Sequence, residues 1–202
     1  LALAGGVDLP PVLGSRSTYL RGRLGGYRGR PLERGDLLSA GVPPVEPHRL
    51  EGRAVRSEMI PGYGDEVEVR VILGPQDDRF TREGIAIFLQ GRYEMTHQSD
   101  RMGARLRGPV IAHTRGHDII SDGVPLGGVQ VAGDGQPIVL LVDRQSTGGY
   151  TKIATVCSFD VGRVGQVRPG QRLRFRQISV GEAHALLRAE QVRLDAAVAK
   201  SG

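Results

Sequence analysis

Aromatic residues and cysteine are scarce in this chain. Tryptophan is absent, aromatic residues make up 4% of the 202 residues, and Cys157 is the single cysteine. The hydrophobic core must therefore be built from Val, Ile, Leu and Ala. One cysteine permits neither a disulfide framework nor a paired-cysteine metal site. This pattern is typical of a reducing compartment and predicts a cytoplasmic location.

Long apolar runs are missing as well. No stretch approaches the roughly 20 consecutive apolar residues that a membrane-spanning helix needs, and no signal-peptide pattern opens the chain. We therefore expect no association with a membrane. The opening LALAGGVDLPPVLGS instead resembles an apolar strand from the middle of a fold. We expect the chain to be a piece of a longer protein, or a product cut at the start of a strand.

Lysine is nearly absent, although basic residues are not. Of the 27 basic residues, only Lys152 and Lys200 are lysines, and the formal net charge is +5. The arginines are scattered among acidic residues and form no dense block interleaved with aromatics, which argues against a nucleic-acid interface. Lys152 is a compact cation with a tunable pKa, whereas arginine is a fixed fork. Its presence has two interpretations of equal weight, a chemical role and retention by chance.

Glycine and proline are plentiful, with 30 and 12 residues, and 39% of the chain is hydrophobic. This composition is typical of a globular, turn-rich fold. Segment 41–64 contains four prolines and no sustained periodicity, which indicates a linker. We therefore expect two parts: residues 1–64, the remainder of a smaller β-rich unit plus a linker, and residues 65–202, a mainly β domain.

The second part has the alternation and turn spacing of a β-barrel or β-sandwich. Thr81 is a predicted N-cap for a short helix that ends near Gln90. Ser179 and Glu182 have capping-box spacing and predict a C-terminal helix. One face of that helix is expected to carry Ala183, Leu187, Leu194 and Val198. The predicted strands are 66–73, 93–96, 110–112, 129–132, 137–142, 152–159 and 172–180, the last with a bulge near residue 177.

Several catalytic and binding motifs are absent from the sequence. It contains no P-loop, no nucleophile-elbow serine and no HExxH zinc motif. His113 and His117 stand four residues apart, but the glycine between them disfavours a helix. We interpret them as loop histidines and predict no metal site.

Polar residues cluster instead at the ends of predicted strands. The densest cluster is DRQSTGGYTK, between two apolar runs, where a simple hairpin would need only two to five turn residues. Each aspartate taken singly could equally serve an Asx turn or a structural ion pair. Loops of such polar density on a β scaffold are nevertheless where binding sites usually lie.

Five stretches together resemble a known family: GSRSTYLRG, GPQDDRF, SDRMG, SDGVPLGGVQVAGDGQPIVLLVDRQSTGGYTKIATV and PGQRLRF with SVGEA. They are similar to the allophanate hydrolase subunit 2 family, also described as the C subunit of 5-oxoprolinase and as subdomains A and B of the urea carboxylase carboxyltransferase domain. The resemblance implies two β-rich units, the second a cyclophilin-like β-barrel with a short helix and a C-terminal helix. It also implies that the usual N-terminal portion is missing.

The resemblance implies a subunit of a multi-protein, ATP-dependent 5-oxoprolinase that acts on a small cyclic amide or urea-like substrate. The expected partners are a subunit 1 homologue and a LamB/YcsF-like amidohydrolase subunit. One alternative is a carboxyltransferase component that moves a carboxyl group from carboxybiotin to urea. Another is a non-catalytic regulatory partner of a kinase-inhibitor-like subunit 1. The chain has no biotin-acceptor Met-Lys-Met, so ATP or carboxybiotin is expected to come through partner subunits.

An amide substrate needs a hydrogen-bonding pair for its N–C=O edge and cations or backbone N–H groups for a developing oxyanion. Asp143, Tyr150 and Lys152 are the predicted catalytic residues, with Tyr150 as a proton donor. We expect Asp134, Asp143, Arg144, Tyr150 and Lys152 to face one shared hollow. The predicted substrate-binding residues are Arg101, Asp122, Asp134, Gln136, Arg144, Gln145, Gly148 and Gly149.

Overall fold

The structure is a computed structural model that describes residues 3–51, 55 and 57–199. The chain divides into two compact units, Leu1–Val55 and Arg56–Gly202, and the division falls inside the proline-rich segment 41–64. Within the described residues, no helix is both long and apolar enough to cross a bilayer.

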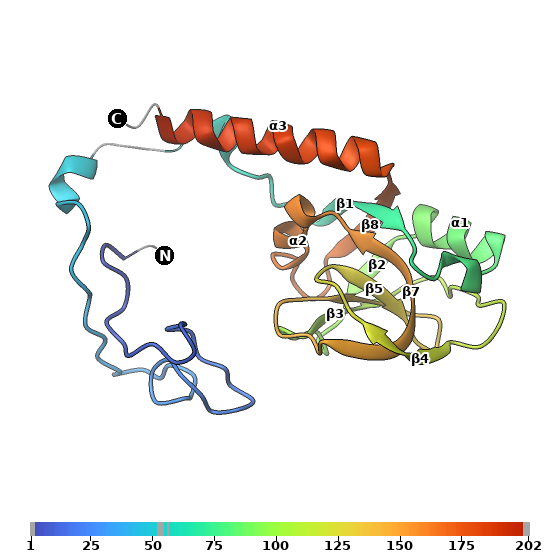
Figure 1. Cartoon of the computed structure of the whole chain (residues 1–202), viewed down its shortest axis with the longest axis horizontal. Helices are drawn as coiled ribbons and strands as arrows, with labels where there is room; N and C mark the ends of the chain where they lie inside the picture. Colours follow the sequence, from blue (N-terminus) through green and yellow to red (C-terminus); the bar gives the residue numbers. More distant parts are fainter. Residues whose placement is uncertain (1–2, 52–54, 56, 200–202) are drawn as a thin grey trace. The chain divides into compact units, whose positions relative to one another are not determined.

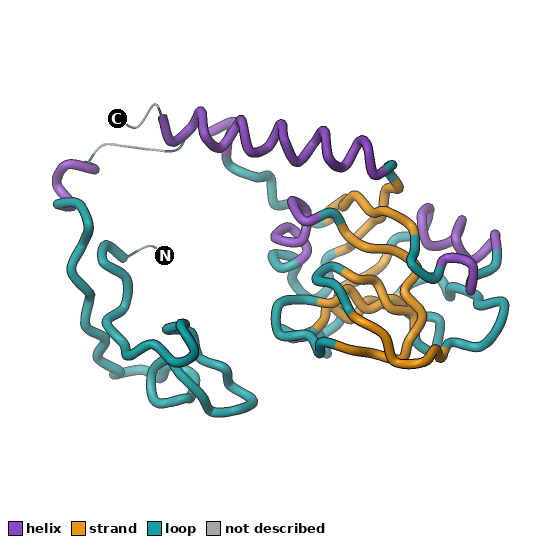
Figure 2. The backbone as a smooth tube through the Cα atoms, in the orientation of Figure 1, coloured by secondary structure: helices purple, strands orange, loops and turns teal. Residues whose placement is uncertain are grey.

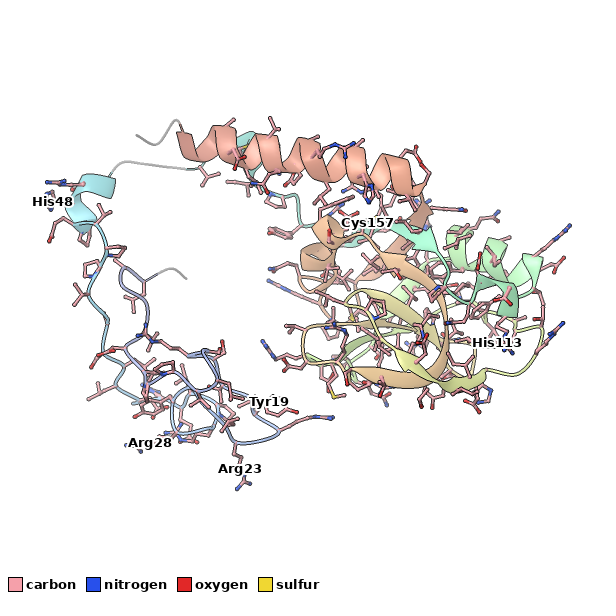
Figure 3. The ribbon with its side chains drawn as sticks, in the orientation of Figure 1. Tyr19, Arg23, Arg28, His48, His113 and Cys157 are labelled. Carbon is pink, nitrogen blue, oxygen red and sulfur yellow. The ribbon has the colours of Figure 1, made fainter. Side chains whose placement is uncertain are left out.

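The first unit consists of turns and loops. Besides the 3₁₀ helix η1 (Pro47–Leu50), its described residues contain only isolated bridges, including Val7 with Ala40 and Tyr19 with Leu24. Figure 2 shows this unit almost entirely as loop. The strand expected at the start of the chain is therefore reduced to isolated bridges at Val7 and Val12, and residues 1–2 lie outside the described residues. The side chains of Arg23 and Arg28 are exposed on these loops (Figure 3).

The second unit is a closed β-barrel. Its strands follow the order β1-β8-β2-β3-β6-β5-β7, and β7 pairs back to β1, which closes a ring of seven. Strand β4 is added to the outside of β7, and only β1 and β8 run parallel among the described strands. Figure 1 shows the strands wound round a common centre. The strands are β1 (Glu66–Leu73), β2 (Tyr93–Met95), β3 (Gly103–Arg107), β4 (Asp118–Gly123), β5 (Gly128–Val131), β6 (Pro137–Leu140), β7 (Thr147–Val156) and β8 (Arg172–Gln177).

The helices and turns join these strands and cover the barrel. The 3₁₀ helix η2 (Ser57–Met59) precedes β1, and the 3₁₀ helix η3 (Asp77–Arg79) follows it. Helix α1 (Arg82–Gln90) begins as predicted, because the Thr81 hydroxyl accepts a hydrogen bond from the Gly84 N–H at 2.8 Å. Gly84 is required inside this helix because a Cβ there would lie 2.5 Å from the Ala112 carbonyl oxygen.

Apolar side chains from every strand of the ring meet in one core. Phe88 of α1 stacks on Phe175 of β8, with ring centroids 4.4 Å apart, and Tyr93 of β2 lies 5.8 Å from the same ring. The predicted alternation of β1 is confirmed, with Val67, Val69 and Val71 buried. The core, which contains no tryptophan, is therefore filled by aliphatic side chains packed around a few aromatic rings.

Several predicted boundaries are wrong. Residues 110–112 form no strand, whereas β3 and β4 were not predicted. Strand β7 begins at Thr147 rather than Lys152 and ends at Val156, because Ser158–Val164 turns into helix α2. Strand β8 ends at Gln177 without the expected bulge, and Ile178 packs into a second, smaller cluster.

The C-terminal helix α3 (Val180–Ala199) begins with the predicted capping box. The Ser179 N–H donates to a Glu182 carboxylate oxygen at 2.7 Å, and the Glu182 N–H donates to the Ser179 hydroxyl at 3.2 Å. Ala183 is buried, but Leu187 and Leu194 are exposed, so the expected apolar face is only partly covered in the described part of the chain. The side chain of Val198 lies outside the described residues.

Candidate functional site

Strand β7 lies at the centre of the candidate site because it pairs with β4 on one side and β5 on the other. Side chains two residues apart on a strand share a face, so Gly148, Tyr150 and Lys152 share one face of β7. The register places Asp122 of β4 opposite Gly148. It places Gln130 of β5 opposite Lys152. Three separate strands therefore bring polar groups to the same surface.

Lys152 is a fully buried cation whose acidic partner is largely exposed. Its side chain is 1% exposed, and its Nζ lies 3.3 Å from Oδ2 of Asp122, whose side chain is 58% exposed. The backbone at Lys152 is held by Gln76, whose side-chain oxygen accepts the Lys152 N–H at 3.1 Å. The Gln76 N–H in turn donates to the Lys152 carbonyl at 3.1 Å. The ammonium is thus fixed inside the fold, while its counter-charge faces solvent.

Gln130 carries a buried hydrogen-bond donor without an acceptor. The residue is 2% exposed, and its Nε2 has no hydrogen-bond partner among the described residues. Such an unmade bond costs about 1–3 kcal/mol. A Cβ added to Gly148 would lie 2.8 Å from this Nε2 and 3.5 Å from Nε2 of Gln145. Glycine at position 148 therefore lets the backbone of β7 approach these two amide groups closely, and we call this group of residues the Gly148 niche.

The carboxyl group of Asp122 is held in its charged form. The Gly123 N–H, which donates to Oδ1 at 2.7 Å, lowers the pKa of Asp122 most, followed by the hydrogen bond from Lys152. Gln76 also lowers this pKa. At neutral pH the Gly148 niche therefore combines a carboxylate acceptor with ammonium and amide donors. This is the complement of an N–C=O edge.

The other face of β7 carries a separate histidine contact. Thr151 is fully buried, and its hydroxyl lies 3.1 Å from Nε2 of His113. His113 packs against Phe80 at 4.6 Å between ring centroids and lies beside the barrel (Figure 3). Burial lowers the pKa of His113. The rings of His113 and His117 are 6.3 Å apart, and the described residues contain no group of three or more His, Cys, Asp or Glu that could hold a metal.

The structure does not bring all the predicted site residues to one hollow. Asp122, Gln145, Gly148 and Lys152 meet at the Gly148 niche, whereas Gly149 faces away, toward the Ile119 carbonyl on β4. Gln130 was not predicted from the sequence. The available signal was a glutamine inside the otherwise apolar run GVQVA.

A second group of predicted residues ties loops together elsewhere. Arg101 and Asp143 form a two-pronged ion pair at 2.8 and 3.2 Å. Arg144 donates from Nε to the Val124 carbonyl at 3.0 Å, which is a structural contact.

The remaining predicted residues make their contacts outside both groups. Asp134 accepts the Gln136 N–H in a local turn, and the Gln136 side chain bonds both backbone groups of Gly108. Tyr150 is 41% exposed, with its ring 6.1 Å from that of His117. The expectation of one shared hollow is therefore corrected to separate locations, because most of these side chains are engaged in their own local contacts.

Comparison with known proteins identifies the family. The family model "Carboxyltransferase domain, subdomain A and B" matches residues 1–177. The C subunit of the Escherichia coli (strain K12) 5-oxoprolinase is 38% identical over 183 residues, which are 91% of this chain and 57% of that protein. The urea amidolyase of Lachancea kluyveri is 32% identical over 96% of this chain and 12% of its own length.

A solved structure gives the same result at the level of the fold. The crystal structure of the Kluyveromyces lactis urea carboxylase superposes with a TM-score of 0.80 at 30% identity, over 96% of this chain and 19% of that one. The chain spans about three fifths of the length of the bacterial 5-oxoprolinase subunits that it matches. With the family model covering most of its length, the chain belongs to the carboxyltransferase domain, subdomain A and B, family.

Proposed function

We propose that this chain is a subunit of a multi-protein, ATP-dependent 5-oxoprolinase and that the Gly148 niche binds the amide of its substrate. The bacterial relatives, which are C subunits of 5-oxoprolinase, support the first part. The buried Nε2 of Gln130 next to Lys152 and Asp122 supports the second and is the observation that carries it.

The proposed chemistry follows from the groups in the niche. The carbonyl oxygen of a small cyclic amide accepts hydrogen bonds from Nζ of Lys152 and Nε2 of Gln130, while Asp122 accepts the amide N–H. As negative charge develops on that oxygen, the fixed ammonium stabilises it. One such preorganised donor is worth about 10²–10³ in kcat. Asp122 is exposed to solvent and is the first of these groups that the substrate can reach, whereas Lys152 and Gln130 are buried.

We propose that partner subunits supply ATP binding and the groups for hydrolysis, which the Gly148 niche does not provide. We propose a subunit 1 homologue and a LamB/YcsF-like amidohydrolase subunit as partners. ATP is proposed to bind outside this chain, because the sequence contains no P-loop motif. The hydrolytic step on the C–N bond belongs to the assembled complex.

The similarity to urea carboxylase favours one second candidate, carboxyl transfer to urea. Urea presents the same N–C=O edge, and carboxybiotin carried by another chain would supply the carboxyl group. The donors Lys152 and Gln130 fit an oxygen of either carboxyl or urea. The two candidates therefore differ in partners rather than in the local geometry of the Gly148 niche.

The test is reconstitution with the two proposed partners and measurement of 5-oxoproline-dependent ATP hydrolysis. Lys152→Met and Gln130→Met are expected to lower kcat by about 10²-fold or more, with complex formation unchanged by size-exclusion chromatography. Arg105→Met, an exposed change on β3, is the matched control. Full activity of Lys152→Met would refute the site. Activity only with a biotin carboxylase and urea would favour the second candidate.

A further inference from the structure

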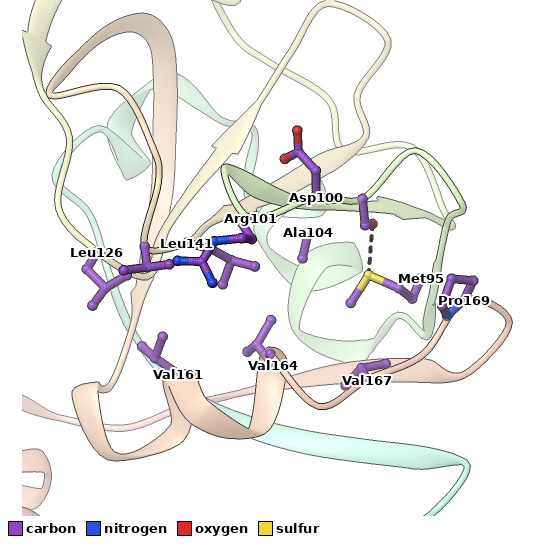
Figure 4. A pocket seen from close by; sticks show the side chains of 13 residues that line it. Met95, Asp100, Arg101, Ala104, Leu126, Leu141, Val161, Val164, Val167 and Pro169 are labelled. Carbon is purple, nitrogen blue, oxygen red and sulfur yellow. Dashed lines mark hydrogen bonds between the residues drawn. The ribbon is translucent and has the colours of Figure 1, made fainter. Parts of the chain in front are cut away.

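A cavity lies at another part of the barrel and takes no part in the proposed amide chemistry. Its volume is about 520 Å³, within the range of small-molecule sites. Figure 4 shows it between helix α2 (Ser158–Val164) and the ends of β2, β3 and β6. Its walls are mainly the apolar side chains of Met95, Ala104, Leu141, Val161, Val164 and Val167.

Arg101 is the cationic group that lines this cavity. Asp143 binds its Nε and Nη2, and the Asp143 N–H donates to the Arg101 carbonyl at 2.9 Å. Asp143 therefore orients the guanidinium, although the Arg101 side chain is 62% exposed. In Figure 4 it lies over the cavity beside Leu141 and Leu126. No bond to its Nη1 is found within the described part of the chain.

The carboxylate of Asp100, next to Arg101 in the sequence, does not point into the cavity. In Figure 4 the carboxylate of Asp100 points away from Val161, Val164 and Val167. One of its oxygens accepts the N–H groups of Met102 and Gly103 at 2.8 and 3.1 Å. The cavity thus has apolar walls with the guanidinium of Arg101 at one side. The carboxylate of Asp100 is hydrogen-bonded to backbone N–H groups.

We propose that this cavity binds a small molecule with an aliphatic body and a terminal carboxylate or carboxamide. The chain of such a ligand packs against the valines of α2 and against Ala104, and its terminal oxygen accepts from Nη1 of Arg101. A guanidinium donates to an oxygen acceptor and has no acceptor to offer an ammonium group. The site is distinct from the Gly148 niche, so the protein has room for a second ligand beside its substrate.

The absence of tryptophan makes a direct binding test simple. Val142 lines the cavity and is 61% exposed, so Val142→Trp places a single fluorescent reporter at the rim of the full chain. The probes are octanoate, octanamide and octylammonium. We expect saturable fluorescence changes with octanoate and octanamide, and octylammonium to bind at least about 10-fold more weakly than octanoate.

Two variants in the reporter background locate the ligand. Arg101→Met should weaken octanoate binding about 10-fold or more, whereas Arg105→Met, on β3 but outside the cavity, should leave it unchanged. Val161→Phe should abolish binding by filling the cavity, with the circular dichroism spectrum retained. Absence of a saturable signal, or equal binding of octylammonium and octanoate, would overturn the proposal.

A third variant separates this proposal from the proposed function. Lys152→Met should lower the amide-directed activity about 10²-fold or more and leave octanoate affinity within about two-fold. The titration is then repeated with the subunit 1 homologue present. Unchanged octanoate affinity supports a small-molecule site. Competitive loss of binding would overturn it, since the cavity would then receive an apolar side chain of the partner.

Discussion

At the scale of single residues, the Gly148 niche contains two buried hydrogen-bond donors. One of them has a partner and the other has none. The ammonium of Lys152 has Asp122 at 3.3 Å, whereas Nε2 of Gln130 has no acceptor among the described residues. Buried donors without partners are rare in folded proteins because they lose hydration without replacement. We infer that Gln130 is retained for what it binds rather than for stability.

This argument predicts opposite effects of one substitution on stability and activity. Gln130→Leu removes an unsatisfied amide from a buried site, so we expect the free energy of unfolding to rise by about 1 kcal/mol while the amide-directed activity falls. Urea denaturation and the reconstituted assay measure the two effects. Gln136→Leu is the control, since its amide is bonded to Gly108 on both sides and its loss should destabilise. Destabilisation by Gln130→Leu would contradict the argument.

His113 provides a prediction about pH. Burial lowers its pKa in the folded state. As the pH falls below the ordinary value of about 6.5, the histidine therefore becomes protonated in the unfolded chain before it does so in the folded chain. Stability should therefore be full above that value and fall as the pH drops from 6.5 toward the folded pKa. His113→Phe keeps the contact with Phe80 and should flatten this decline in urea midpoints. His184→Gln, at an exposed position on α3, should leave the decline in place.

The Gly148 niche was predictable in part at this scale. Asp122, Gln145, Gly148 and Lys152 are polar or glycine residues at the ends of apolar runs, and that position made them recognisable in the sequence. Gln130 was hidden because its neighbours in the niche come from other strands. Asp134 and Arg144 have the same local sequence character as Asp122, but turn and carbonyl contacts engage them, and sequence alone does not distinguish the two cases.

At the scale of elements, local signals decided which predictions succeeded. Helix α1 has a capping threonine and helix α3 has a capping box, and both begin where predicted. Helix α2 was missed because Cys157 and Phe159 continue the apolar run of β7. Strand β3 was missed although its buried and exposed residues alternate from Ala104 onward, because the glycines and the Arg-rich sequence suggested a loop.

A buried ion pair helps to hold helix α2 to the barrel. The carboxylate of Asp160 is fully buried and accepts from Nε and Nη2 of Arg70, each at 2.6 Å, and from the Arg70 N–H at 2.8 Å. Burial alone would raise the pKa of Asp160, but the hydrogen bonds from Arg70 outweigh it and lower the pKa. The pair therefore supports α2 against β1, next to the cavity that α2 lines.

We expect Asp160→Ala to cost about 3 kcal/mol in the free energy of unfolding, because it leaves the charge of Arg70 without its buried partner. Chemical denaturation followed by circular dichroism measures the loss. Glu190→Ala, which removes an exposed pair with Arg193 on α3, should change stability little. Because the pKa of Asp160 is lowered, its contribution is present above about pH 4 and is lost as the pH falls through the folded value.

At the scale of the whole molecule, closure of the seven-stranded ring leaves β4 as the strand outside it. Strand β7 has neighbours on both sides, whereas β4 pairs only with β7 among the described strands and is mostly exposed. Closure was not predictable from alternation, because it depends on the pairing of β1 with both β7 and β8. The barrel class was predictable from the spacing of the strands.

This arrangement predicts a difference in hydrogen exchange between neighbouring strands. Backbone amides of β4 should exchange faster than those of residues 151–156 in β7, since β4 can open without breaking the ring. Exchange measured by mass spectrometry on peptides of the intact chain tests this. Equal protection of the two strands would contradict the view of β4 as an outer strand. Addition of substrate should slow β4 if Asp122 binds it.

Lys152 also has a consequence for reagents that modify primary amines. In the folded chain its Nζ is shielded, so an acylating reagent can attack it only in moments when the surrounding strands separate. The rate of acylation at this position, followed by mass spectrometry, would therefore measure how often the strands around Lys152 open. Lysine is otherwise found only at position 200 in this chain. Acylation of Lys152, the residue proposed to act on the substrate, would therefore report local opening around its own site.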